Sequence, residues 1–282
     1  MMANSCAAST KRKRNTVWRH WLSFLHYTIP PIRPSELHIC LWIVWMFKQK
    51  KKLAYNTVRS YLYSLAAELK FRGGRDIVGK DHSWFIHSTL KHFKSKLGTQ
   101  PIVYRRPLTV DLLFSLLGTL DLSDFDTLVY ATMLAVGVFC LLRIGELCWV
   151  RSGDRLKFIM NRDLTFNKGS IELTLWQTKT DRDRRGVKKW INDLKGVPFN
   201  PYEMVHRLKA MKLKSLRPVE PFFALSSGKA VSKAMLILFL QTHMKRLFPK
   251  VSQREWTGIS LRKGGATSAL RAGVSGGHPK AG

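Results

Sequence analysis

An uninterrupted apolar run in the middle of the chain limits the folds that this sequence can adopt. It extends from Leu128 to Leu142 and ends abruptly at Arg143 and Glu146. A membrane-spanning helix needs roughly 18–20 apolar residues, and this run is shorter. A helix that is apolar on every side has to be covered by other parts of the chain. The run therefore predicts a buried core helix inside a domain with several surrounding elements.

The residues before this run follow a helical period from Thr16 to about Gly98. The clearest example is the stretch from Ala54 to Phe71, in which apolar residues recur at i, i+3, i+7, i+10 and i+14. Ser35 is placed to cap the start of the second helix, which precedes this stretch. A fourth helix is expected around Phe85 to Lys96. We predict a helical domain of four helices over residues 15–104, preceded by a basic, disordered tail over residues 1–14. Tyr104 to Pro107 reads as a linker, because it is charged and closed by proline.

The residues after the linker, 107–282, mix two periods. Thr109 is expected to cap a helix, Ser123 and Asp126 to form a capping box for the apolar helix, and Ser260 to cap a last helix through Ala272. Alternating apolar residues predict strands at 156–159, 163–166, 171–175 and 187–191, with a hairpin turn at 167–169, and a further helix is expected at 232–248. The predicted fold class is α+β, mainly α, with a small antiparallel sheet in the second domain.

The charge of the chain restricts its partners. The sequence holds 48 Lys and Arg against 18 Asp and Glu, a formal net charge of +30, and with 45% hydrophobic residues the chain as a whole is not a disordered basic segment. Residues 1–106 contribute +16 (20 basic, 4 acidic) and residues 107–282 contribute +14 (28 basic, 14 acidic). A folded chain this basic favours a nucleic-acid partner over a membrane surface, and we expect no membrane association. The predicted DNA contacts are Lys50, Lys51, Lys52, Arg59, Lys91, Lys94, Arg105, Arg106 and Lys263.

Other sequence features give weaker indications. The four cysteines show no metal-ligand spacing, and we expect reduced structural thiols, no metal and no cofactor. The basic run Lys11 to Arg14 is a nuclear-import signal, a phosphate-binding arm or simply a solvated charge run. It predicts a nuclear location if the source is eukaryotic, and an intracellular one otherwise.

Three short motifs carry candidate chemistry. The first, Leu142-Arg143-Ile144-Gly145-Glu146-Leu147, places Arg143 and Glu146 on one helix face, as a buried ion pair or as an oriented phosphate clamp. The second, Trp176-Gln177-Thr178-Lys179-Thr180-Asp181, runs off the end of a strand, where a lysine is commonly just an exposed charge. In the third, Gly258 to Thr267, Arg262 is expected in the first turn of a helix, where an anion is favoured. Its adjacent glycines are explained if another backbone packs closely there.

Together these motifs, in this order, resemble the tyrosine recombinases (the phage-integrase family), and more closely those of Crypton-type elements and of tyrosine-recombinase retrotransposons. The resemblance covers nearly the whole chain. Residues 15–104 look like the family's SAM-like core-binding domain, and residues 107–282 look like most of its catalytic domain. It implies that Arg143, Lys179 and Arg262 are catalytic and that Glu146 supports Arg143.

The resemblance also implies a chemistry. Family members cut DNA by attack of a tyrosine hydroxyl on a backbone phosphate, while two arginines hold the phosphate oxygens and the lysine protonates the leaving oxygen. This sequence has Ile259 where the family has a histidine, and no tyrosine follows Tyr202. The sequence ends 20 residues after Arg262, so the catalytic domain looks incomplete at its C-terminus and no nucleophile is assigned.

These observations lead to two hypotheses. The first is a DNA-binding protein of the tyrosine-recombinase type, serving DNA recombination and integration of a mobile element, which as written binds double-stranded DNA without cleaving it. It would be a monomer that associates with itself only on DNA. The alternative is a non-enzymatic basic protein that binds duplex DNA or structured RNA.

Overall fold

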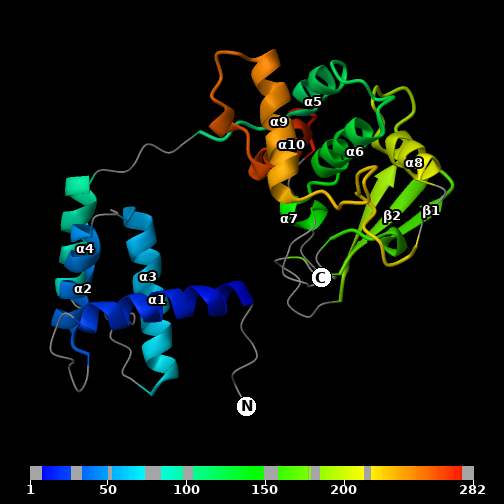
Figure 1. Cartoon of the computed structure of the whole chain (residues 1–282). Helices are drawn as coiled ribbons and strands as arrows, with labels where there is room; N and C mark the ends of the chain where they lie inside the picture. The colour runs from blue at the N-terminus through cyan, green and yellow to red at the C-terminus, as the bar shows by residue number, and fades with distance from the viewer. Residues whose placement is uncertain are drawn as a thin grey trace. The chain divides into compact units, whose positions relative to one another are not determined.

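The computed structural model describes residues 8–26, 34–49, 53–73, 84–97, 104–148, 158–176, 178, 185–212 and 217–274. The chain divides into two compact units, an N-terminal unit of Met1–Ile102 and a C-terminal unit of Val103–Gly282 (Figure 1). In the described ranges, no helix is both long and apolar enough to cross a membrane.

The described part of the N-terminal unit is helical. Its helices are α1 (Ala8–His26), α2 (Glu36–Lys48), α3 (Tyr55–Phe71) and α4 (Trp84–Leu97). Helix α1 packs on α3, and α2 packs on α4. The predicted apolar stripe of α3 is buried at Val58, Leu62, Leu65 and Leu69. Large aromatic side chains supply much of the remaining core, where the ring of Trp21 meets that of Trp42 edge-on at 5.5 Å.

The predicted disordered tail is wrong for residues 8–14, because α1 begins at Ala8. Lysine and arginine are good helix formers, so the basic run can extend a helix that Val17, Trp21 and Phe24 anchor in the core. The side chain of Lys13 also donates a hydrogen bond to the hydroxyl of Ser60 on α3. Residues 1–7 lie outside the described ranges.

The C-terminal unit combines helices with one small sheet. Its elements are α5 (Val110–Leu117), α6 (Phe125–Phe139), α7 (Ile144–Leu147), the 3-10 helix η1 (Asn161–Asp163), β1 (Leu164–Asn167), β2 (Ser170–Leu175), β3 (Val187–Asn192), α8 (Pro201–Met211), α9 (Lys233–Leu247), the 3-10 helix η2 (Gln253–Glu255) and α10 (Gly258–Arg271). The strands form an antiparallel sheet in the order β1-β2-β3, in which Leu173 pairs with Leu164 and with Lys189. The predicted fold class, α+β and mainly α, is confirmed.

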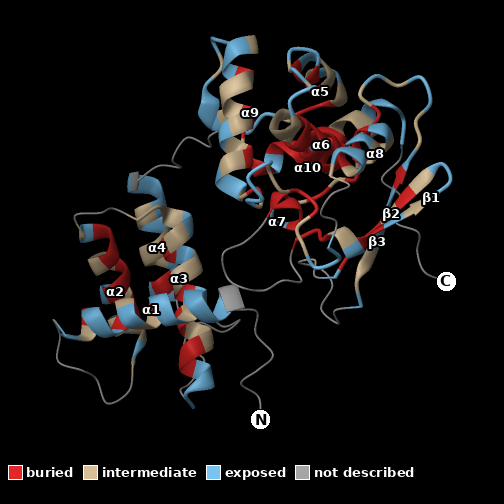
Figure 2. Ribbon diagram, turned by 45° about the vertical axis from the view of Figure 1, so that its right-hand side comes forward, coloured by how far each residue is buried: buried red, intermediate tan, exposed pale blue. Residues whose placement is uncertain are grey.

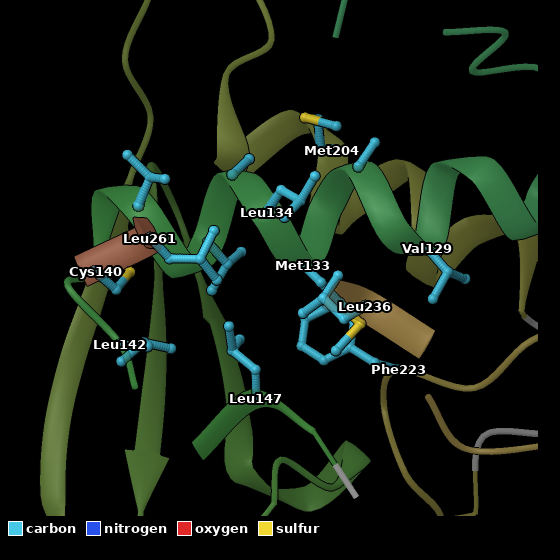
Figure 3. Packing of buried hydrophobic residues seen from close by; sticks show 14 of the residues in the cluster. Val129, Met133, Leu134, Cys140, Leu142, Leu147, Met204, Phe223, Leu236 and Leu261 are labelled. Carbon is cyan, nitrogen blue, oxygen red and sulfur yellow. The ribbon is translucent and has the colours of Figure 1, made fainter. Parts of the chain in front are cut away.

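The apolar run forms the centre of this unit, as predicted. Helix α6 is buried along most of its length (Figure 2), and Leu128, Met133 and Leu134 have no exposed surface. Side chains from α7, α8, α9 and α10 pack around it (Figure 3). The inner sheet residues Ile171 and Leu173 close the same core. This packing fixes the positions of the short elements that follow α6.

Several details differ from the sequence predictions. The cap of α6 is Asp124, whose carboxylate accepts a hydrogen bond from the Thr127 N–H, while Ser123 bonds to Asp121. The strand expected at 156–159 is not formed at its described residues, 158 and 159, and helix α8 was not predicted. Asn200 caps α8, and Pro201 is its first residue. An asparagine followed by proline is a typical helix start, and this signal could have predicted α8.

Candidate nucleic-acid interface

Arg143 stands at a sharp turn between α6 and α7. Helix α6 ends at Phe139, and Leu141 then adopts a positive φ of 55°, which reverses the chain. Few residues other than glycine accept this conformation, at a cost of about 1 kcal/mol, and it is maintained by the packing around it. Arg143 becomes the N-cap residue of α7, so its side chain leaves the core at a position that α6 determines.

Glu146 holds Arg143 at two points. One carboxylate oxygen, Oε2, accepts the Arg143 backbone N–H at 2.7 Å, and Oε1 accepts from Nη1 of the guanidinium at 3.0 Å. The Glu146 side chain is 9% exposed, whereas that of Arg143 is 32% exposed. The pair predicted from the i, i+3 spacing is therefore present in the structure. The guanidinium keeps further N–H donors that can reach an anion from solvent.

Arg262 lies on α10, in a position that differs from the prediction. The helix begins at Gly258 with Thr257 as N-cap, and Ser260 is the third helical residue rather than the cap. Arg262 is therefore in the second turn, beyond the first-turn N–H groups that would favour an anion. Its side chain is exposed, and among the described residues it has no hydrogen-bond or ion-pair partner.

Glycines bring α10 close to the rest of the unit, as the sequence predicted. A Cβ on Gly258 would lie 2.4 Å from Ile144 Cγ2, and one on Gly265 would lie 2.1 Å from the Val138 carbonyl oxygen. Either distance is shorter than any ordinary contact, so a side chain would force the elements apart. The start of α10 consequently packs directly on α7, next to Arg143.

Leucines from α7 and α10 meet on α6, close in sequence to the two arginines. A Cβ on Gly137 would lie 2.9 Å from Leu147 and 3.1 Å from Leu261. Figure 3 shows Leu147 and Leu261 pointing into the same cluster of buried side chains. Because these leucines adjoin Glu146 and Arg262 in sequence, the two arginines extend from neighbouring elements of one rigid core.

Three other residues of the motifs are Lys179, Trp176 and Ile259. Lys179 falls outside the described ranges, between the end of β2 and the start of β3. The side chain of Trp176 is fixed by a hydrogen bond of 2.9 Å from its Nε1 to Asp163. Ile259, three residues before Arg262, is 52% exposed and presents an apolar surface at the start of α10.

The predicted DNA contacts are distributed over both units. In the N-terminal unit, Arg59, Lys91 and Lys94 are exposed, and the Arg59 guanidinium lies 5.8 Å from the Tyr63 ring centre. Lys50, Lys51 and Lys52 lie outside the described ranges.

The other three predicted contacts belong to the C-terminal unit, and all are exposed. Arg106 forms an ion pair with Glu255, and Lys263 donates to the carbonyl oxygen of Arg105. Nothing in the local sequence of Glu255 indicates a partner 149 residues away, so this contact could not be predicted.

Thiol and metal chemistry receive no support from the described residues. Burial raises the pKa of the Cys140 and Cys148 thiols to about 12, so both stay protonated at neutral pH and are poor nucleophiles. Within the described part of the chain, no group of three or more His, Cys, Asp or Glu side chains is placed to hold a metal ion.

The structure resembles solved recombinases, although no protein-family model and no curated protein matches the sequence. The integrase of the transposon Tn1549, in complex with transposon right-end DNA, superimposes with a TM-score of 0.62 and 17% identity, covering 99% of this chain and 85% of the integrase chain. The site-specific recombinase XerH, bound to a palindromic difH substrate after cleavage, gives a TM-score of 0.59 and 11% identity over 95% of this chain and 69% of XerH. The chain therefore has the fold of the tyrosine recombinases.

Proposed function

We propose that this chain is a DNA-binding protein of the tyrosine-recombinase type, acting in the recombination or integration of a mobile element. The observation that carries the proposal is the pairing of Arg143 and Arg262 on α7 and α10, which are held together by the close contacts of Gly258. Two guanidinium groups on adjoining elements, one of them held by a carboxylate, suit the non-bridging oxygens of a backbone phosphate. Glu146 orients the first of them.

The charge distribution supports duplex DNA as the partner. Both parts of the sequence are strongly basic, +16 over residues 1–106 and +14 over residues 107–282. Phosphate contacts dominate the affinity of such proteins and are sequence-independent. The solved structures of similar fold are complexes with DNA in the two cases described above.

A salt titration tests the proposal. Binding of a fluorescent duplex should weaken steeply as salt rises, with a log–log slope of about −0.9 for each phosphate neutralised. An unlabelled duplex should compete for the site much better than a structured RNA of equal length. A flat salt response, or stronger competition by the RNA, would contradict the proposal.

Cleavage is a separate question. No tyrosine follows Tyr202 in the 282 residues, and Ile259 cannot transfer a proton. The 282-residue polypeptide should therefore form no covalent adduct with a nicked suicide substrate, as judged by a denaturing gel. Appearance of an adduct would reveal a substitute nucleophile. Self-association on DNA and the nuclear location stay predictions.

A further inference from the structure

The segment from Tyr104 to Val110, called the docked segment below, is not a free linker. Three of its backbone N–H groups donate hydrogen bonds to the region of α10: Arg106 to the Glu255 carbonyl at 3.1 Å, Leu108 to the Ser260 carbonyl at 2.9 Å and Val110 to the Ser268 hydroxyl at 2.9 Å. Donors and acceptors advance together along the chain, so the docked segment runs alongside η2 and the first turns of α10.

Gly264 allows this close approach. A Cβ at this position would lie 1.7 Å from the Leu108 carbonyl oxygen, closer than any non-bonded contact permits. Leu108 and Thr109 are buried as a result. The docked segment therefore covers one side of α10 and limits how the helix can rotate.

Lys263 and Glu255 fasten the beginning of the docked segment. Nζ of Lys263 donates to the Arg105 carbonyl at 2.9 Å and lies 4.9 Å from the centre of the Tyr104 ring. On the other side, the Glu255 carboxylate accepts from Nε of Arg106 at 2.7 Å. The lysine charge is thus used inside the unit, by a carbonyl and an aromatic face.

Arg262 is the sequence neighbour of Lys263 but is used differently. Consecutive residues of an α-helix point about 100° apart, so the two side chains leave α10 in different directions. Lys263 reaches the docked segment, whereas Arg262 has no partner among the described residues. The contacts of Lys263 therefore bear on the orientation of the helix that carries Arg262.

We propose that Lys263, anchored on Tyr104 and Arg105, is a positioning residue that orients α10 so that Arg262 can bind a DNA phosphate. Lys263 then acts through Arg262 and does not contact DNA itself. This inference rests on the proposed function, because it assigns the phosphate contact to Arg262. It also changes the interpretation of Arg105 and Arg106, which were predicted to contact DNA. The Arg105 carbonyl accepts from Lys263, and the Arg106 side chain pairs with Glu255.

A double-mutant cycle tests the proposal. Affinity for a fluorescent duplex is measured at several salt concentrations for wild type, Arg262→Met, Lys263→Met and the double variant. We expect Arg262→Met to weaken binding about tenfold and to reduce the salt slope by about 0.9, the loss of one phosphate. Lys263→Met should weaken binding about fivefold alone but less than about twofold when Arg262 is already methionine, as residues acting through one contact are not additive.

Two further variants control for non-specific effects. Lys263→Arg should restore affinity to within about twofold of wild type, because a guanidinium can also donate to the carbonyl and lie over the ring. Lys245→Met is the matched control, since Lys245 donates to the Pro249 carbonyl at the end of α9 rather than to the docked segment, and its loss should leave affinity unchanged.

Hydrogen exchange tests the anchoring of the docked segment separately from the effect of Lys263 on DNA affinity. Without DNA, Lys263→Met should accelerate exchange of the Arg106 and Leu108 amides, which donate to Glu255 and Ser260. Fully additive losses of affinity would overturn the positioning role, because Lys263 would then hold its own phosphate. Unchanged affinity of Lys263→Met would overturn it too, as the anchor would only stabilise the fold. A wild-type chain without salt-sensitive binding would overturn the proposed function itself.

Discussion

The two units carry similar charge but use it in different ways. Residues 1–102 hold 18 basic and 4 acidic side chains, and residues 103–282 hold 30 and 14. In the N-terminal unit, Arg72 forms an ion pair with Glu68, but the predicted DNA contacts Arg59, Lys91 and Lys94 are exposed on α3 and α4. In the C-terminal unit, several cations are held by specific partners, among them Arg143 by Glu146, Arg106 by Glu255 and Lys263 by a carbonyl.

This difference shows why net charge alone does not identify a site. Exposed lysines contribute a diffuse attraction to phosphate, which depends on their number more than on their direction. A guanidinium held by a buried carboxylate, as Arg143 is by Glu146, has a defined direction, and its loss also disturbs the fold. Removing charge from the two units should therefore have different consequences, and the predictions below test that contrast in order of decreasing effect.

The close contact of Gly264 should be the most sensitive feature of the C-terminal unit. Gly264→Ala would place a methyl group 1.7 Å from the Leu108 carbonyl oxygen, and we expect a loss of about 3 kcal/mol or more in the free energy of unfolding. The matched control is Gly145→Ala on α7, where no atom lies within 4 Å of the new Cβ. Urea titration of both variants measures the difference, and equal stability would contradict the packing of the docked segment on α10.

Arg143→Ala should reduce both stability and affinity. Glu146, 9% exposed, would lose its cationic partner, which costs about 1–3 kcal/mol of unfolding free energy. Adding Glu146→Gln should recover much of that stability without restoring DNA affinity, because the phosphate contact is still missing. Arg207→Ala, which removes an exposed arginine on α8, serves as the control. If Glu146→Gln restored affinity as well, Arg143 would be purely structural.

The double substitution Lys91→Ala and Lys94→Ala in α4 should change binding but not stability. Each lysine is exposed, so unfolding free energy should stay within about 0.5 kcal/mol of wild type. If both contact phosphate, the salt slope should become less steep by about 1.8 in total. Anisotropy titrations at several salt concentrations measure it, and an unchanged slope would remove α4 from the interface.

The smallest effect concerns the pH dependence of the N-terminal unit. His20 lies among the rings of Trp42, Trp45 and Tyr61, and burial lowers its pKa below the ordinary value of 6.5. The unfolded chain then takes up a proton before the folded one, so this contribution to stability is complete above pH 6.5 and is lost as pH falls through the folded pKa.

Replacing this histidine should remove that pH dependence. His20→Phe should show a smaller fall in melting temperature between pH 7 and pH 5 than wild type, whereas His92→Phe, at an exposed position of α4, should behave like wild type. A His20→Phe variant with the full wild-type decline would show that the aromatic environment does not govern this titration.

Regular, repeated patterns in the sequence were sufficient to predict most elements. The apolar run predicted α6, the stripe of Val58, Leu62 and Leu65 predicted α3, and alternation predicted the hairpin around Gly169. These predictions succeed because helix and strand periods are local consequences of backbone geometry. The pairing of Arg143 with Glu146 could be predicted from the i, i+3 spacing, and the structure forms it between the N-cap and the third residue of α7.

Contacts between distant residues could not be predicted in this way. The sequence indicated a linker at Tyr104 to Pro107, and only the tertiary structure shows these residues bound beside α10 through Glu255 and Lys263. The sequence likewise indicated that Ser260 caps the last helix. In the structure α10 begins three residues earlier than that cap implies, at Gly258, which packs on Ile144. The sequence thus determined most of the elements and the charged groups of this protein. The tertiary structure determined which charged side chains have partners within the C-terminal unit and which face solvent. The physical reason is that such partners come from segments that are distant in the sequence.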